Sequence, residues 1–199
     1  FHFQPMSQSF SQMRCAELSE GPEPNSAAGA DASGGGIGDG GVGSGLFDSL
    51  LRVGPRPFNP HAPGRHALLR EQIATAPTLH ELWPQVLARL AGAFIVAHNA
   101  GTERSILAAA APLHAFGPWI DTLPLARAAW PGLPSYELER LTEVFGLTPD
   151  IARLCPGRAP HDALYDAVAS AALLLHLLRQ PGWETLSAEE LAEMSGKWK

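Results

Sequence analysis

The chain has 199 residues, of which 45% are apolar and 17% are charged, and its formal net charge is -6. This length and this apolar content suit one domain with a core of its own. The negative charge argues against a broad basic surface for duplex binding, but it is compatible with a local nucleic-acid groove around bound metal ions.

The N-terminal quarter of the chain is predicted to be a strand meander that contains a glycine-rich loop. Strand-like patterns cover Phe1–Gln4, Gln12–Leu18 and Leu46–Val53, and these segments, paired in order, would form an antiparallel meander. The stretch Gly21–Gly45 holds almost no large side chain, so it cannot bury enough apolar surface to offset the entropy of ordering. We therefore expect a disordered loop there. Its G-x-G-x-x-G match at Gly38–Gly43 follows no predicted strand and is weak evidence for dinucleotide binding.

The central part of the chain is predicted to alternate helices and strands. Thr78 and Glu81 form the pattern of a capping box at the start of an amphipathic helix over Thr78–Leu90, with Pro84 inside it. Ala93–Ala97 is a short apolar run of the kind expected for a strand that is buried on both faces. A polar turn and an alanine-rich helix follow this strand.

A second strand and two more helices continue this order. Pro118–Asp121 is a short strand candidate, and a helix through Leu123–Trp130 follows it. Ser135 is expected to cap the next helix, which ends at Val144 before Gly146. A meander followed by alternating strands and helices predicts a mixed α/β sandwich with polar loops at the strand ends.

The last predicted helix carries candidate functional residues at its N-terminal end. Pro160 disfavours a helical conformation in the residue before it, so a helix can begin at about His161 or Asp162. Apolar side chains at helical spacing continue it to Leu178. This arrangement places His161 at the N-terminal end of the helix and Asp166 about one turn further along it. Taken alone, the segment fits a capped core helix with an incidental histidine equally well.

These patterns predict one domain followed by a short tail. We expect the domain over residues 1–180, with residues 21–45 as a loop inserted in it, and a charged, peripheral tail over residues 181–199. The two cysteines, Cys15 and Cys155, lie far apart, which favours free thiols in a reducing cytoplasm over a disulfide framework or a structural zinc site. No apolar run reaches membrane-spanning length, so we expect no membrane partner. The chain starts at Phe1 rather than at a methionine, which leaves targeting open.

Glu103 and Asp166 are the two carboxylates that we expect to converge, because each lies early in a predicted helix after a strand or a tight loop. Two carboxylates and a histidine suit metal-dependent phosphodiester hydrolysis. The hard carboxylate oxygens bind Mg²⁺ or Mn²⁺, and the histidine deprotonates the attacking water. Two carboxylates alone are few ligands for two such ions, since a site of this kind normally has four.

Several ordered motifs resemble those of one enzyme family. Val96–Ala100, followed by Glu103, resembles the second exonuclease motif of the DnaQ-like (DEDDh) 3'-5' exonucleases. Ile120–Arg127 is similar to the central segment of that family. His161–Ala167 resembles its third motif, with the histidine and the aspartate at the family's spacing. The resemblance covers roughly Leu46–Leu178.

The resemblance implies a ribonuclease H-like fold, in which a mixed central sheet, an antiparallel meander plus parallel strands, is flanked by helices. It also implies removal of nucleotides from the 3' ends of single-stranded DNA or RNA with two Mg²⁺ or Mn²⁺ ions, and a polymerase or another replication or repair protein as a partner. By position, His161 would be the general base, Asp166 would be a metal ligand, and Glu103 would occupy the aspartate position of the second motif. His98 and Asn99 would contact the substrate, although Asn99 alternatively caps the helix that follows it.

The metal-ligand positions of this sequence depart from the family pattern. The family's first motif is Asp-x-Glu, and the best-spaced segment here is His2-Phe3-Gln4, so His2 and Gln4 stand at two degenerate positions. Either the motif has degenerated, which the spacing to the next strand favours, or a true Asp-x-Glu strand lies before Phe1. Glu103 is longer than aspartate by one methylene, which predicts weakened catalysis because metal geometry is sensitive to displacement.

Two hypotheses about function follow from the sequence. The first is a metal-dependent 3'-5' exonuclease, which His161 and Asp166 favour. The second is a catalytically inactive pseudo-exonuclease that serves as a nucleic-acid-binding or protein-docking module, which His2, Gln4 and Glu103 favour.

Overall fold

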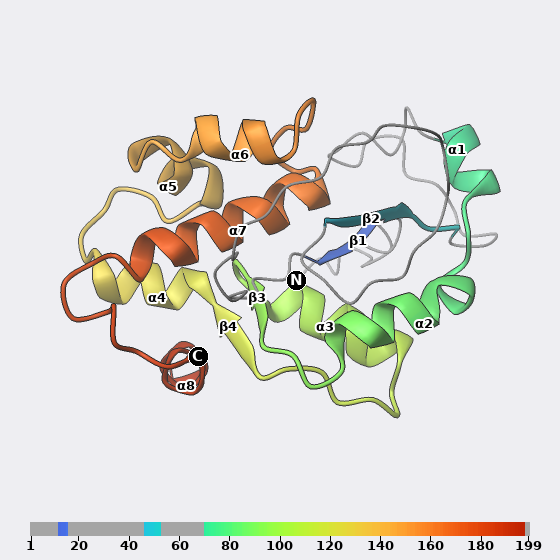
Figure 1. Cartoon of the computed structure of the whole chain (residues 1–199), viewed down its shortest axis with the longest axis horizontal. Helices are drawn as coiled ribbons and strands as arrows, with labels where there is room; N and C mark the ends of the chain where they lie inside the picture. Colours follow the sequence, from blue (N-terminus) through green and yellow to red (C-terminus); the bar gives the residue numbers. More distant parts are fainter. Residues whose placement is uncertain (1–11, 16–45, 53–69, 198–199) are drawn as a thin grey trace, which may run out of the picture.

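The computed structural model describes residues 12–15, 46–52 and 70–197, and it consists of short strands surrounded by helices (Figure 1). The predicted strand Phe1–Gln4, with His2 and Gln4, and the glycine-rich loop over residues 21–45 lie outside these ranges. Within them the fold belongs to the α/β class, as predicted.

An antiparallel pair forms the first sheet. β1 (Gln12–Cys15) pairs with β2 (Phe47–Leu50), and Gln12 lies opposite Leu50. This pairing confirms the antiparallel arrangement that was expected between the second and third segments of the meander.

A parallel pair forms the second sheet. β3 (Ile95–Ala97) pairs with β4 (Trp119–Asp121) so that Ala97 lies opposite Asp121, and α3 (Gly101–Ala110) is the helix of the crossover between them. All residues of β3 are half-buried, so the prediction of a strand buried on both faces is wrong. In the described ranges β4 is the one strand that pairs with β3, which leaves the other edge of β3 without a strand partner there.

Helices make up most of the remaining described structure. In chain order they are α1 (Arg70–Thr75), α2 (Leu79–Leu90), α4 (Thr122–Ala129), α5 (Leu138–Val144), α6 (Thr148–Leu154), α7 (Ala163–Leu177) and α8 (Ala188–Gly196).

The predicted capping box at the start of α2 is confirmed. The Glu81 N–H donates to Thr78 Oγ1 at 3.2 Å, and the Thr78 N–H donates to Glu81 Oε2 at 2.6 Å. The helix continues through Pro84. Its buried side chains, Val86 and Leu90, pack with residues of α3 and β4, so α2 covers the crossover unit.

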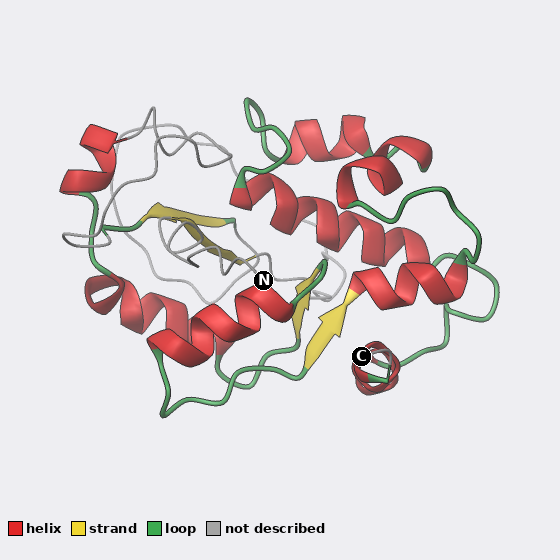
Figure 2. Cartoon of the chain, turned by 180° about the vertical axis from the view of Figure 1, so that it is seen from behind, coloured by secondary structure: helices red, strands yellow, loops and turns green. Residues whose placement is uncertain are grey.

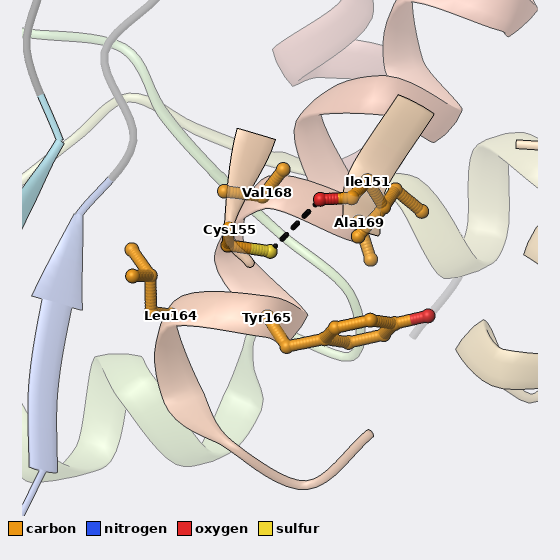
Figure 3. Close-up of a cluster of buried hydrophobic side chains, with 6 residues drawn as sticks. All are labelled: Ile151, Cys155, Leu164, Tyr165, Val168 and Ala169. Atoms are coloured by element: carbon orange, nitrogen blue, oxygen red, sulfur yellow. Dashed lines mark hydrogen bonds between the residues drawn. The ribbon is translucent and has the colours of Figure 1, made fainter. Parts of the chain in front are cut away.

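The longest described helix, α7, lies at the centre of the fold (Figure 1). It contacts α4, α5, α6, β1 and β3, and its side chains are apolar almost all round, as expected for a buried helix. One part of this core lies between α6 and α7, where Cys155 and Ile151 pack against Leu164 and Val168 (Figure 3). There the Cys155 thiol donates to the Ile151 carbonyl at 3.1 Å. Because α7 contacts both strand pairs, it connects the two sheets.

The C-terminal residues differ from the prediction of a peripheral tail. Leu191 of α8 is buried, and the Ser195 hydroxyl donates to the Trp119 carbonyl of β4 at 3.1 Å. Both views show α8 beside β4 (Figure 1 and Figure 2). The interpretation of this segment as peripheral is therefore wrong for Ala188–Gly196.

The region between α4 and α7 differs from the prediction in two smaller respects. Glu137, not Ser135, is the N-cap residue of α5, and the Ser135 hydroxyl accepts a hydrogen bond from the Glu137 N–H at 3.2 Å. The helix α6 was not predicted from the sequence. None of the helices in the described ranges has the length and apolar content to cross a membrane.

Candidate active site

The parallel pairing of β3 and β4 brings the residues that follow both strands to one edge of the sheet. Because Ala97 lies opposite Asp121, His98 and Asn99 leave β3 beside the start of α4. In α/β folds, the edge where parallel strands end is a common position for a binding site.

The Asp121 carboxylate joins the two strand ends. Its Oδ1 accepts hydrogen bonds from the N–H of Asn99 at 2.8 Å and of Leu123 at 3.0 Å, and its Oδ2 accepts one from the N–H of Ala100 at 2.9 Å. Asp121 is thus the N-cap of α4 and also contacts the turn before α3. The N-cap residue of α3 is Ala100, without a side-chain hydrogen bond, so the alternative in which Asn99 caps this helix is wrong.

His98 ties the end of β3 to the loop before α5. Its Nε2 lies 2.8 Å from the Tyr136 carbonyl oxygen, and its Nδ1 lies 2.9 Å from Thr122 Oγ1. A carbonyl only accepts, so Nε2 carries the proton. Burial lowers the pKa of His98, so the ring is neutral and its Nδ1 accepts from the Thr122 hydroxyl. Both ring nitrogens therefore contact protein, and the contact of His98 with substrate stays a prediction, as does that of the exposed Asn99.

Glu103 lies in the first turn of α3, where the helix dipole favours a negative charge. The residue as a whole is exposed, but neighbouring protein atoms partly desolvate its carboxyl group. This desolvation raises the pKa of Glu103, and the charges of Asp121 and Asp166 raise it further. The carboxylates of Glu103 and Asp166 thus lie close enough to interact electrostatically, and their joint role as metal ligands stays a prediction.

Asp166 and His161 meet at the N-terminal end of α7. The N–H of His161, whose φ is 68°, donates to Asp166 Oδ1 at 3.2 Å. Asp166 is half-buried; desolvation raises its pKa, while the hydrogen bond from His161 and the charge of that residue lower it. His161 is exposed. In the described part of the chain Asn99 and His161 are the non-glycine residues with positive φ, a conformation that is often found at functional sites.

An arginine holds the loop before α7 in place. Arg158 Nη1 donates to Asp162 Oδ2 at 3.0 Å, and Arg158 Nη2 donates to Asp48 Oδ2 of β2 at 2.5 Å. Asp162 is buried and is the N-cap of α7, since its Oδ1 accepts from the N–H of Leu164 at 3.1 Å. The loop that carries His161 is therefore attached to both α7 and β2.

The carboxylates at this site suit a hard divalent cation. Glu103 and Asp166 offer oxygen ligands, and a cation between them would relieve the repulsion that raises the pKa of Glu103. Mg²⁺ is often bound by one or two carboxylates together with waters and substrate phosphate, so these two residues fit one such ion. Within the described ranges no group of three or more His, Cys, Asp or Glu side chains could hold a metal ion.

The sequence singled out Glu103, His161 and Asp166, but it missed Asp121 and Arg158. Asp121 lay inside a recognised motif segment, and its position before a helix was a signal for an N-cap. Arg158 gave no local signal, because its partner Asp48 is 110 residues away in the chain.

Comparison with known proteins places the chain among nucleases. It is 31% identical over 144 residues to exodeoxyribonuclease 10 of Escherichia coli, which covers 71% of this chain and 58% of the relative. It is also 31% identical over 136 residues to a DNA polymerase III subunit epsilon-like protein of Rhodobacter capsulatus, which covers 67% of this chain and 18% of the relative. No protein-family profile matches the chain.

A solved structure shares the fold. Exonuclease X in complex with 5' overhanging duplex DNA aligns with a TM-score of 0.56 and 30% sequence identity, over 76% of this chain and 82% of that one. The chain spans less than two thirds of the length of the Escherichia coli relative, at 58%.

Proposed function

Because this chain belongs to the DnaQ-like family of 3'-5' exonucleases and shares their ribonuclease H-like fold, we propose that it hydrolyses phosphodiester bonds at nucleic-acid 3' ends with divalent metal ions. The observation that supports the proposal is the electrostatic interaction of Glu103 with Asp166, whose carboxylate accepts a hydrogen bond from the N–H of His161. Desolvation and like charge raise the pKa of Glu103, and desolvation raises that of Asp166, as expected for a site built to hold a cation.

Three residues would perform the chemistry. Glu103 and Asp166 would hold Mg²⁺ or Mn²⁺, which supplies an activated water and stabilises charge on the phosphate. His161 would accept a proton from the attacking water, since its ring is exposed and its backbone is fixed by Asp166. The water oxygen forms a bond to phosphorus, the bond to the preceding 3' oxygen breaks, and that oxygen takes up a proton from solvent water and becomes a new 3' hydroxyl.

The substrate that we propose is a single-stranded 3' end of DNA or RNA. The DNA complex of the solved relative supports nucleic acid as the ligand. A polymerase or another replication or repair protein as a partner, and a cytoplasmic location, remain predictions from the sequence.

The second candidate function is a pseudo-exonuclease that binds nucleic acid or docks to protein without cleavage. The observation that favours it is Glu103 itself, because its side chain extends one methylene further from α3 than the aspartate of the family.

Digestion of a 5'-labelled single-stranded oligonucleotide with Mg²⁺ or Mn²⁺ tests the proposal. Asp166→Asn removes a ligand charge but keeps an oxygen that can accept from His161. Asp150→Asn in α6, where Asp150 forms an exposed ion pair with Arg153, is the matched control.

We expect laddering from the 3' end that Asp166→Asn reduces by about a hundredfold and Asp150→Asn leaves unchanged. If the folded wild type gives no ladder with either metal, the exonuclease proposal fails. Titration of the same oligonucleotide by fluorescence anisotropy would then test the binding module.

A further inference from the structure

We propose that Asp121 is a positioning residue, whose carboxylate fixes the turn between β3 and α3 so that Glu103 faces Asp166. The inference rests on the proposed function only in taking Glu103 as a metal ligand. Asp121 does not itself need to contact the metal or the substrate.

The hydrogen bonds of Asp121 reach two different helices. One of them, from Leu123 N–H at 3.0 Å, caps α4, the helix that Asp121 itself precedes. The others, from Asn99 N–H at 2.8 Å and Ala100 N–H at 2.9 Å, come from the turn that precedes α3. One carboxylate therefore caps its own helix and holds the entrance of another.

The turn before α3 lacks a cap from its own sequence. Ala100 has no side chain that can accept a hydrogen bond, and Asn99 makes no capping bond to α3. The first N–H groups of a helix have no partner within the helix, so an acceptor from elsewhere is needed. Asp121 supplies an acceptor at this turn, and its negative charge also suits the positive end of the helix dipole.

Glu103 depends on this turn because it lies in the first turn of α3, three residues after Ala100. A change in the path of Asn99 and Ala100 would shift the start of α3 and move the Glu103 carboxylate relative to Asp166 on α7. Metal ligands tolerate little displacement, and residues that orient them affect metal affinity. The site therefore requires the turn to be fixed.

The chemistry of the contact requires a carboxylate. The Oδ1 of Asp121 accepts from two N–H groups and its Oδ2 accepts from one. Both terminal atoms of the side chain must therefore be hydrogen-bond acceptors, which is true of a carboxylate. An asparagine would offer one acceptor and turn an NH₂ group toward an N–H. A serine, which is also a good N-cap residue, would keep the α4 cap. Its side chain is shorter and carries a single oxygen, so it would not replace the contacts to Asn99 and Ala100.

The competing explanation is that Asp121 only caps α4. Two variants separate the roles: Asp121→Asn, which disturbs the contact to the turn, and Asp121→Ser, which keeps the α4 cap and guards against loss of folding. Thr78→Ala, which removes the side-chain cap of α2, is the control for a purely structural loss of capping.

The experiment combines amide hydrogen exchange by NMR with Mn²⁺ titration followed by the electron paramagnetic resonance signal of free Mn²⁺. We expect both Asp121 variants to speed exchange at Asn99 and Ala100 by about tenfold or more and to weaken Mn²⁺ binding by about 10- to 100-fold. Thr78→Ala should change neither quantity.

The outcomes distinguish this inference from the proposed function. Unchanged exchange at Asn99 and Ala100, or faster exchange without weaker Mn²⁺ binding, would overturn the positioning role. If the wild type binds no Mn²⁺, the metal site of the proposed function fails, and exchange at the turn alone decides whether Asp121 fixes it.

Discussion

By the resemblance to its family, Glu103 is predicted to stand where the family has an aspartate. Its carboxylate is attached one methylene further from α3 than an aspartate would be. If that length displaces the metal ligand, shortening the side chain restores the family geometry.

We expect Glu103→Asp to raise the kcat for exonucleolytic digestion by about tenfold, since displacements of this size cost one to two orders of magnitude. The control is Glu189→Asp, which makes the same change in the first turn of α8. A lower kcat, or an equal gain in the control, would contradict the role given to Glu103.

His98 is the residue through which pH should act on stability. Burial lowers its pKa below the usual 6.5, so below that pH the unfolded chain takes up a proton at this position that the folded protein resists. The contribution of His98 to the free energy of unfolding is therefore complete above pH 6.5 and is lost as the pH falls toward the folded pKa.

Urea unfolding at a series of pH values measures this effect. The series runs from about 7.5 to about 5, which brackets the unperturbed histidine pKa. His98→Gln should flatten the fall in stability, and His80→Gln, at an exposed position in α2, should not. Equal slopes for wild type and His98→Gln would show that His98 is not held neutral.

Residues of the site could be predicted when a motif carried them, and not when their contacts were distant. Glu103, His161 and Asp166 became candidates through their spacing within motifs, and their roles stay predictions. The contact of Asp121 with Asn99 crosses 22 residues and that of Arg158 with Asp48 crosses 110, so neither is encoded in a local pattern.

At the scale of elements, the clearest local signal was the capping box of α2. Thr78 and Glu81 lie three residues apart and exchange both hydrogen bonds of the box. Thr78→Ala should lower the free energy of unfolding by about 1 kcal/mol in denaturant titration, because it leaves an N–H of the first turn without its partner.

Thr75→Ala is the control for that prediction. The Thr75 hydroxyl donates to carbonyls of α1 and caps no helix start. An equal loss of stability in both variants would show that the box contributes nothing beyond the loss of a threonine.

Elements without such signals were placed less well. The helix α6 has seven residues and one fully buried position, Ile151, which is too short a pattern to separate from a loop. For α5, Ser135 offered the better capping side chain, but the chain enters the helix two residues later at Glu137. Both helices pack against α7, a tertiary contact that no local pattern encodes.

At the scale of the whole molecule, packing of the C-terminal helix could not be predicted, because the charges of α8 suggested a peripheral segment. Leu191 is 3% exposed and packs with Ile120, Leu174 and Leu177, on elements distant in sequence. Leu191→Ala should lower the free energy of unfolding by about 2–5 kcal/mol. Leu113→Ala, at a side chain 94% exposed, should change it little.

Denaturant unfolding of the two variants gives the comparison. A small effect of Leu191→Ala, near that of Leu113→Ala, would mean that α8 is not part of the cooperative fold. It would also mean that α8 does not stabilise β4, the strand that ends at Asp121.

The site as a whole is formed by elements that meet around α7. Its N-terminal end supplies Asp166, the loop before it supplies His161, and the crossover unit of β3, α3 and β4 supplies Glu103 (Figure 1). We propose that these residues form a single divalent-metal site for hydrolysis at the 3' end.

The most direct test is a crystal structure of the protein soaked with Mn²⁺ and a short single-stranded oligonucleotide, with anomalous scattering recorded for the metal. We expect an anomalous peak for a Mn²⁺ ion that is bound by carboxylate oxygens of Glu103 and Asp166. The last phosphodiester group at the 3' end and the side chain of His161 should lie beside it. A bound oligonucleotide with no metal peak between these two carboxylates would contradict the claim.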